Sequence, residues 1–251
     1  MPPKIDLAYF SFTEITDPRE HGSYNEWHLF DHVPENLALP GIAWGQRWVA
    51  TRDLERVGGS DAGLDAVHYV TAYLMREPAD RTLGEFLGLG HRLRALGRFH
   101  AHRRALLGGP FRLVKTYAAP RALVAPDAVP YRPHRGVLVA VADVDDARRA
   151  DDVARWTDDV LCPTLVATPG VAGAWWFEAM PDAATTLAGN PPRRTIHVAW
   201  LDGDPLDVSA AVRGSVAQLD EHDGAHVLFA RVLRTVDPFG PFDWFDERNA
   251  P

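Results

Sequence analysis

The chain has 251 residues, 46% of them hydrophobic, with a formal net charge of -8 and an isoelectric point near 5.7. This apolar content supports a substantial core, and the length suits one large domain or two of ordinary size. The negative charge argues against nucleic acid as a partner, because binding to its backbone depends on clustered cations.

The sequence also predicts a soluble protein of a reducing compartment. Cys162 is the single cysteine, so no disulfide can form within the chain. The apolar run after Lys4 is too short for a signal peptide. Charged or turn-forming residues interrupt every segment before it reaches the roughly 20 apolar residues of a membrane span. We therefore expect a cytoplasmic location and no membrane contact.

Taken in chain order, the first half is predicted to contain a strand, a helix, a two-stranded hairpin, a second helix and a last strand. These elements cover residues 5–12, 23–39, 42–51, 66–75, 81–107 and 111–118. The second half repeats the order at residues 136–142, 147–168, 171–180, 195–202, 206–219 and 226–235. Each first helix ends at a Pro-Gly pair, where proline cannot continue a helix and glycine tolerates positive φ.

A fixed offset of 129 residues relates the two halves. It pairs identical residues without gaps: Trp27 with Trp156, Pro34 with Pro163, Ala38 with Ala167, Pro40 with Pro169, Gly41 with Gly170, and Ala43 with Ala172. His68 falls on His197 at the same offset. Matches of rare tryptophan and of a Pro-Gly pair at one register predict a tandem duplication.

The repeated order βαββαβ is that of the ferredoxin-like split βαβ unit, whose sheet is covered by helices on one face only. Because the bare apolar face needs a partner, we predict an α+β fold of two tandem ferredoxin-like modules packed as an intramolecular α+β barrel. The predicted domains are module 1 at residues 1–119, a proline-rich linker at 120–134, a diverged module 2 at 135–236 and an aromatic tail at 237–251. The tail is too aromatic to stay loose in water, so we expect it to cross the barrel, cover a cavity mouth or join a partner subunit.

The sequence from Trp27 to Gly41 reads WHLFDHVPENLALPG. It resembles the first-helix signature of the dimeric α+β barrel superfamily, in particular its EthD-like branch, in which W-x-x-x-[DE]-H-x-P precedes an apolar stretch and Pro-Gly. The resemblance implies a small, mostly apolar ligand in a cavity between sheet and helices. The activities it implies range over polyketide cyclases, muconolactone-type isomerases, cofactor-free monooxygenases and haem enzymes. It also implies that His32 with Asp31 is the functional pair.

The same helix carries most of the candidate catalytic residues. His28, His32 and Glu35 follow the i, i+4, i+7 spacing of one helix face, with Asp31 beside them. A neutral imidazole oriented by a carboxylate is a competent proton shuttle near neutral pH. The alternative is a solvated polar face opposite an apolar side of Phe30, Val33 and Leu37. The second copy has Thr157, Val160, Leu161 and Thr164 at the positions of the four candidates, as expected if one copy keeps a site and the other keeps structure.

Candidate substrate-binding residues lie on the hairpin. Trp44 and Trp48 share one face of a strand, where a flat ligand could stack or a core could pack, and Arg47 lies on the other face. Arg47 beside small residues could anchor a carboxylate, phenolate or enolate. His68 and Tyr69 follow on the next strand, and the recurrence of histidine at 197 favours a structural role for His68.

The basic run at residues 91–104 is predicted to be a solvated helix face, or else a docking site for an acidic partner or an anionic tail. The preferred function is an enzyme that acts on a small hydrophobic, aromatic or enolisable metabolite by general acid-base chemistry, as a cyclase, isomerase or monooxygenase without a cofactor or metal. One alternative is a non-catalytic binding protein of the same fold. A lesser one is a haem enzyme, or a metal enzyme with His28, His32 and Glu35 as ligands. The chain could act as a monomer or homodimer.

Overall fold

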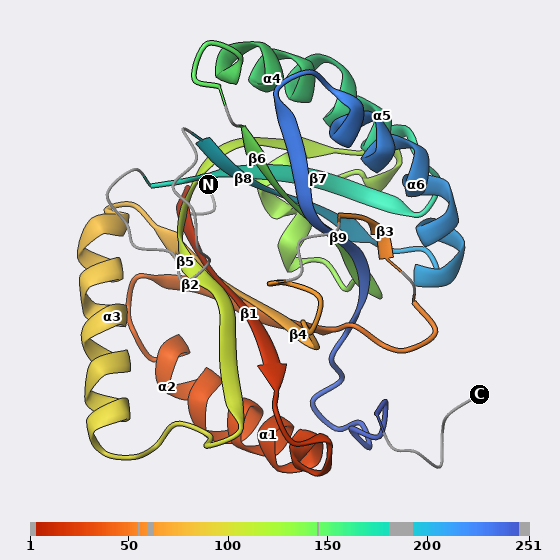
Figure 1. Ribbon diagram of the computed structural model, residues 1–251. Coiled ribbons are helices and arrows are strands. Elements are labelled where there is room, and N and C mark those ends of the chain that lie inside the picture. Colours follow the sequence, from red (N-terminus) through yellow and green to blue (C-terminus); the bar gives the residue numbers. More distant parts are fainter. Residues whose placement is uncertain (1–3, 55, 60–62, 145, 181–192, 246–251) are drawn as a thin grey trace.

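A computed structural model describes residues 4–54, 56–59, 63–144, 146–180 and 193–245, and within them eight antiparallel strands close into a barrel (Figure 1). Their order around the barrel is β2-β4-β1-β5-β7-β8-β6-β9, and β9 returns to β2 where Trp48 lies opposite Thr235. Closure leaves no free edge in the main sheet. The predicted α+β barrel is confirmed.

The first half contains β1 (Ile5–Ile15), β2 (Ile42–Val49), β3 (Arg56–Gly58), β4 (Tyr69–Arg76) and β5 (Arg103–Ala118). Its first helical segment is built from α1 (His21–Trp27), the π-helix η2 (His28–His32) and α2 (Val33–Leu37), and α3 (Ala79–Ala95) is its second helix. The short strand β3 was not predicted. It adds to β9 outside the barrel order, with Arg56 opposite Arg231.

The second half has the same order: β6 (Gly136–Val144), then α4 (Ala150–Trp156), η5 (Thr157–Leu161) and α5 (Cys162–Ala167), then β7 (Val171–Ala179), β8 (Arg193–Leu201), α6 (Pro205–Glu221) and β9 (Ala225–Thr235). The π-helix recurs at the offset of 129 residues. So does a β-bulge, which falls between Ile42 and Trp44 in β2 and between Val171 and Gly173 in β7.

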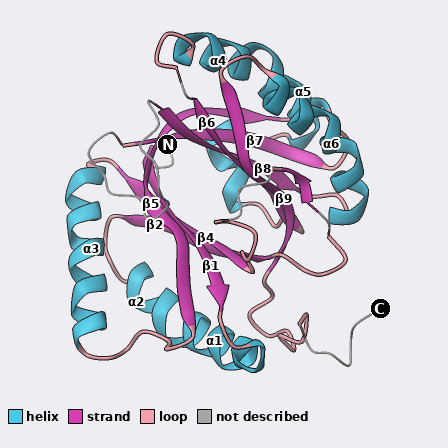
Figure 2. Ribbon diagram, viewed as in Figure 1, coloured by secondary structure: helices cyan, strands magenta, loops and turns pink. Residues whose placement is uncertain are grey.

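Alternation along the strands divides the apolar side chains into two layers. One face of each strand fills the barrel, with a core that includes Phe10, Phe12, Trp48, Trp175 and Phe177. The other face lies under helices, which Figure 2 shows on the outside of the strands in both halves. No helix in the described ranges is long and apolar enough to cross a membrane.

Two predicted boundaries were wrong. The helix expected at residues 81–107 ends at Ala95, and Gly97 follows with φ of 68°, a conformation that terminates helices. The strand β5 then begins at Arg103 instead of residue 111. The basic run at 91–104 is therefore a helix end, a loop and a strand start, not one solvated helix face.

The connecting segments are also packed. The predicted linker forms two 3-10 turns, η3 (Pro120–Ala122) and η4 (Pro126–Tyr131), and its Val129 belongs to the barrel core. The described part of the tail packs Phe242, Trp244 and Phe245 against a cluster around Tyr24 and Tyr69 in the first half. The last residues, 246–251, lie outside the described part.

Candidate functional site

The first helical segment turns a polar face toward the sheet. His28, His32 and Asn36 are buried, whereas Phe30 is 62% exposed and Leu37 is 43% exposed. The expectation that Phe30, Val33 and Leu37 form the inward side was therefore wrong. One physical reason is the π-helix, in which the Val33 N–H donates to the His28 carbonyl five residues back and so shifts the phase of the helix.

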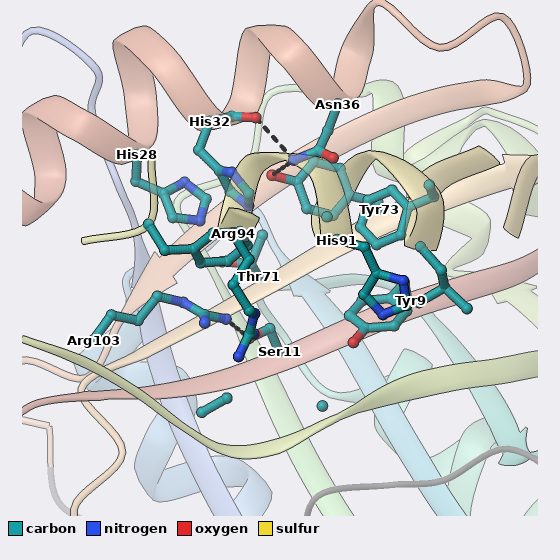
Figure 3. Close-up of a pocket in the computed structure, with 16 residues that line it drawn as sticks. Tyr9, Ser11, His28, His32, Asn36, Thr71, Tyr73, His91, Arg94 and Arg103 are labelled. Carbon is teal, nitrogen blue, oxygen red and sulfur yellow. Dashed lines mark hydrogen bonds between the residues drawn. The ribbon is translucent and has the colours of Figure 1, made fainter. Parts of the chain in front are cut away.

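Between this segment, α3 and the strands β1, β4 and β5 lies a cavity of about 180 Å³. Figure 3 shows His28, His32 and Asn36 reaching into it from the helix, with Tyr9, Ser11 and Thr71 below them on the sheet. The lining residues are Tyr9, Ser11, His28, His32, Asn36, Thr71, Tyr73, Phe86, Leu87, Gly90, His91, Arg94, Phe99, Arg103, Ala105 and Gly108.

The two imidazoles lie together in this cavity. Their ring centroids are 5.1 Å apart, and the His32 ring stacks on Trp27 at 4.9 Å. Neither Nδ1 atom has a hydrogen-bond partner in the described chain. Burial lowers the pKa of His32 to about 4, with help from the charge of Arg103 and against the charge of Asp31. Burial and then the charge of Arg47 hold the pKa of His28 well below its usual value. Both rings are neutral at pH 7 and free to accept a proton.

Hydroxyl and amide groups complete the polar part of the lining. The Asn36 side-chain amide donates to the His32 carbonyl at 2.8 Å and to the Tyr73 hydroxyl at 3.3 Å, which ties the helix to β4. Burial raises the pKa of both Tyr73 and Tyr9, so these phenols stay protonated and can act as donors.

The two predicted carboxylates do not contact the imidazoles. Asp31 accepts two hydrogen bonds from Arg98 Nη2 at 2.9 and 2.8 Å, and Glu35 accepts one from Arg98 Nη1 at 2.7 Å. The Trp27 indole N–H donates to the Arg98 carbonyl at 2.8 Å. These bonds fasten the loop between α3 and β5 to the helix and thereby position Phe99 against His32.

Arg47 is the most unusual of the predicted residues. It is 2% exposed, and its guanidinium lies over the rings of Tyr24 and Tyr69 at 5.0 and 5.3 Å. None of its three side-chain nitrogens has a hydrogen-bond partner in the part of the chain that the structure describes. Its strand neighbour Thr71, which is opposite it in the β2–β4 register, lines the cavity.

The remaining predicted residues lie apart from the imidazoles. Trp44 and Trp48 belong to the barrel interior, where the Trp48 indole N–H donates to His134 at 3.2 Å. Tyr69 lies under Arg47, and its hydroxyl receives a hydrogen bond from the Asn25 amide at 2.9 Å. His68 accepts the Ile15 N–H through Nδ1 and lines a separate surface hollow beside the tail.

The corresponding place in the second half is filled. Trp176 lies opposite His197 as Arg47 lies opposite Thr71, so the sheet register matches His197 to Thr71 and not to His68. The Trp176 ring stacks over His197, and buried Leu161 stands where the first half has His32. The hollow is therefore specific to the first half.

The sequence analysis missed several lining residues. Arg94, Phe99 and Arg103 were assigned to a solvated helix face, and Tyr9 and Ser11 to an ordinary strand. Gly97 was the available signal, because a helix that ends there turns the following residues back over the sheet. Within the described ranges no group of three or more His, Cys, Asp or Glu side chains could hold a metal ion, and Glu35 is engaged by Arg98.

This combination of a closed antiparallel barrel with outer helices is the fold of the dimeric α+β barrel superfamily. No protein-family model and no curated protein matches the sequence. Among solved structures, the chain is similar to a dye-decolorizing peroxidase from Bacteroides thetaiotaomicron, with a TM-score of 0.58, 7% identity and 98% of each chain covered. It is also similar to an anthrone oxidase-like protein, with a TM-score of 0.51, 13% identity, 93% of this chain and 92% of the other covered. A chlorite dismutase variant from Candidatus Nitrospira defluvii has a TM-score of 0.50, 10% identity, and covers 96% of this chain and 94% of its own. At these identities the likeness concerns the fold.

Proposed function

We propose that the protein is an enzyme that removes a proton from a small aromatic or enolisable metabolite in the first-half cavity, without a bound cofactor. The observation that carries this proposal is the pair of buried, neutral imidazoles, His28 and His32, in a cavity that the second half lacks. Cyclases, isomerases and cofactor-free monooxygenases of such substrates share this first step.

His32 is the proposed general base. Its imidazole takes a proton from a carbon next to a carbonyl, or from a phenol, and the electron pair moves onto the substrate oxygen. A ring with a pKa near 4 is a weak base toward a neutral ketone. However, the anion formed beside it would stabilise the imidazolium, and the guanidinium of Arg103 would stabilise the anion. His28 assists as the second imidazole, and Tyr73 supplies a donor at the far wall.

Asp31 and Glu35 are assigned a positioning role through Arg98. They hold the loop that carries Phe99 and so exclude water from the His32 side of the cavity. The enzyme titles among the solved structures, an anthrone oxidase-like protein and a peroxidase, support enzymatic use of this fold.

The test is deuterium exchange in D₂O at the enolisable carbon of phenylpyruvate, followed by NMR and corrected for the rate without protein. General-base catalysis contributes about 10²–10⁴-fold, so His32→Gln should lose at least about 100-fold of the exchange rate. His226→Gln, on β9 in the other half, is the matched control and should keep it. Equal exchange by wild type and His32→Gln removes His32 from the mechanism. Binding without any exchange supports the alternative, a non-catalytic binding protein.

We also propose that the two halves arose by tandem duplication and that the chain descends from the EthD-like branch. The shared positions of the π-helix and the β-bulge support the duplication. The WHLFDHVP motif supports the branch. We expect a cytoplasmic monomer or homodimer, and light scattering on the purified chain distinguishes these two states.

A further inference from the structure

Arginines in this protein usually have carboxylate partners. In the first half alone, Arg98 pairs with Asp31 and Glu35, Arg104 with Glu14, and Arg112 with Asp6. The three arginines around the cavity differ. Arg47, Arg94 and Arg103 form no ion pair with any described residue.

Acidic groups are also missing from the cavity wall. The lining contains Arg94, Arg103 and His91, but no aspartate or glutamate from the described chain. The nearest helix carboxylates, Asp31 and Glu35, point to Arg98 and are neutralised there. In a protein of net charge -8, this hollow is a local concentration of positive charge.

Several donors at the cavity lack acceptors. Arg103 Nη2 donates to Ser11 Oγ at 3.0 Å, which leaves its buried Nε without a partner in the described structure. Arg47 has three such nitrogens. A buried cation without an acceptor is costly, and an anion in the cavity would reduce that cost through charge-assisted hydrogen bonds. Figure 3 shows Arg94, Arg103 and Ser11 grouped near the two imidazoles.

The rest of the wall is aromatic and apolar, with Tyr9, Phe86, Leu87 and Phe99. Arg94 and Arg103 lie over the Phe99 ring at 5.1 and 5.6 Å, which fixes both guanidinium groups at its faces. A dry cavity of about 150 Å³ admits benzene. The volume of about 180 Å³ therefore suits one substituted ring.

From these observations we propose that the ligand is a planar, conjugated monoanion: a single substituted ring whose carboxylate or ionised oxygen faces Arg103 and Arg94, with Arg47 supplying charge from behind Thr71. This inference rests on the proposed function in that both concern the same cavity. It adds the charge that the substrate must carry.

The experiment compares phenylpyruvate with its methyl ester, which share the ring and the enolisable carbon and differ in charge. Calorimetric titration should give an affinity at least about tenfold higher for the acid than for the ester. Arg103→Gln and Arg94→Gln should each remove most of that preference, whereas Arg92→Gln, on α3 outside the lining, should leave it unchanged. A nitrophenol tests the phenolate source, because its anion absorbs in the visible range and should be enriched on binding.

An ester that binds as tightly as the acid overturns the proposal, as does a loss of affinity in the arginine variants that is equal for both compounds. Absence of binding by the acid and the nitrophenol at millimolar concentration also overturns it. The proposed function fails separately. If the acid is preferred but no exchange depends on His32, the site binds anions without the catalysis. If exchange depends on His32 equally for acid and ester, the catalysis stands without the charge requirement.

Discussion

The buried histidines should make the native state acid-labile well above the range in which carboxylates titrate. His28, His32 and His197 each have a pKa lowered by burial, to about 4 for His32 and His197. In the unfolded chain each titrates near 6.5, so the unfolded state binds more protons as the pH falls below 6.5. The stability that the neutral rings provide is therefore complete above pH 6.5 and is lost toward the folded pKa values. Between pH 7.5 and 5.5 the loss is about 1.4 kcal/mol for each ring, or about 4 kcal/mol together.

Urea denaturation at pH 7.5, 6.5, 6.0 and 5.5 measures this loss directly. A decrease of about 4 kcal/mol is a large part of the 5–15 kcal/mol typical of a folded domain. His32→Gln and His197→Gln should each remove about a third of the pH dependence, although one ring lines the cavity and the other is packed under Trp176. Phenylpyruvate should reduce the dependence in His197→Gln more than in His32→Gln, because only His32 can be protonated beside a bound anion. A total loss below about 1.5 kcal/mol would refute the burial argument.

Three shorter predictions concern other residues. Arg98→Gln should cost about 1 kcal/mol or less in unfolding free energy, because its pairs are over a third exposed, yet it should raise hydrogen exchange of the backbone amides in the α3–β5 loop. Arg47→Met should raise the unfolding free energy by about 1–3 kcal/mol in buffer without binding anions, since it removes an unpaired buried cation; destabilisation would mean that the cation has a partner. Leu161→Ala, at a side chain 3% exposed, should lower it by about 2–5 kcal/mol in urea titration.

The sequence predicted the barrel because its signals were of the kind that tertiary structure seldom overrides. Apolar runs bounded by turn residues became strands, and the Pro-Gly pairs at the ends of the first helices fell where predicted. Orientation was harder. An apolar pattern would bury Phe30 and Leu37, whereas the structure buries Asn25 and Asn36, which donate to the hydroxyls of Tyr69 and Tyr73. Those partners lie more than 35 residues away, so no local pattern announces them.

The candidate site was predicted in part for the same reason. His28 and His32 came from a compact motif on one helix. Arg103 enters the cavity only because α3 stops at Ala95, and the leucines and arginines that follow do not differ from those of an ordinary helix. The helix end rests on Gly97 alone, which a helical pattern tolerates at a modest cost. Sequence periodicity cannot weigh that cost against the gain of a strand that pairs with β1.

The asymmetry of the two halves bears on why one half can hold a cavity. Both halves have the same strand order, the same π-helix position and the same bulge, so the backbone does not decide where the hollow forms. The side chains decide it: Trp176 and Leu161 fill the outer layer of the second half, while Arg47 and His32 leave the first half polar and open. A polar hollow forgoes apolar burial and adds unpaired donors, both of which reduce stability. Because β5 pairs with β7 and β2 with β9, the packed half and the open half unfold as one barrel, and the first supplies the stability that the second gives up.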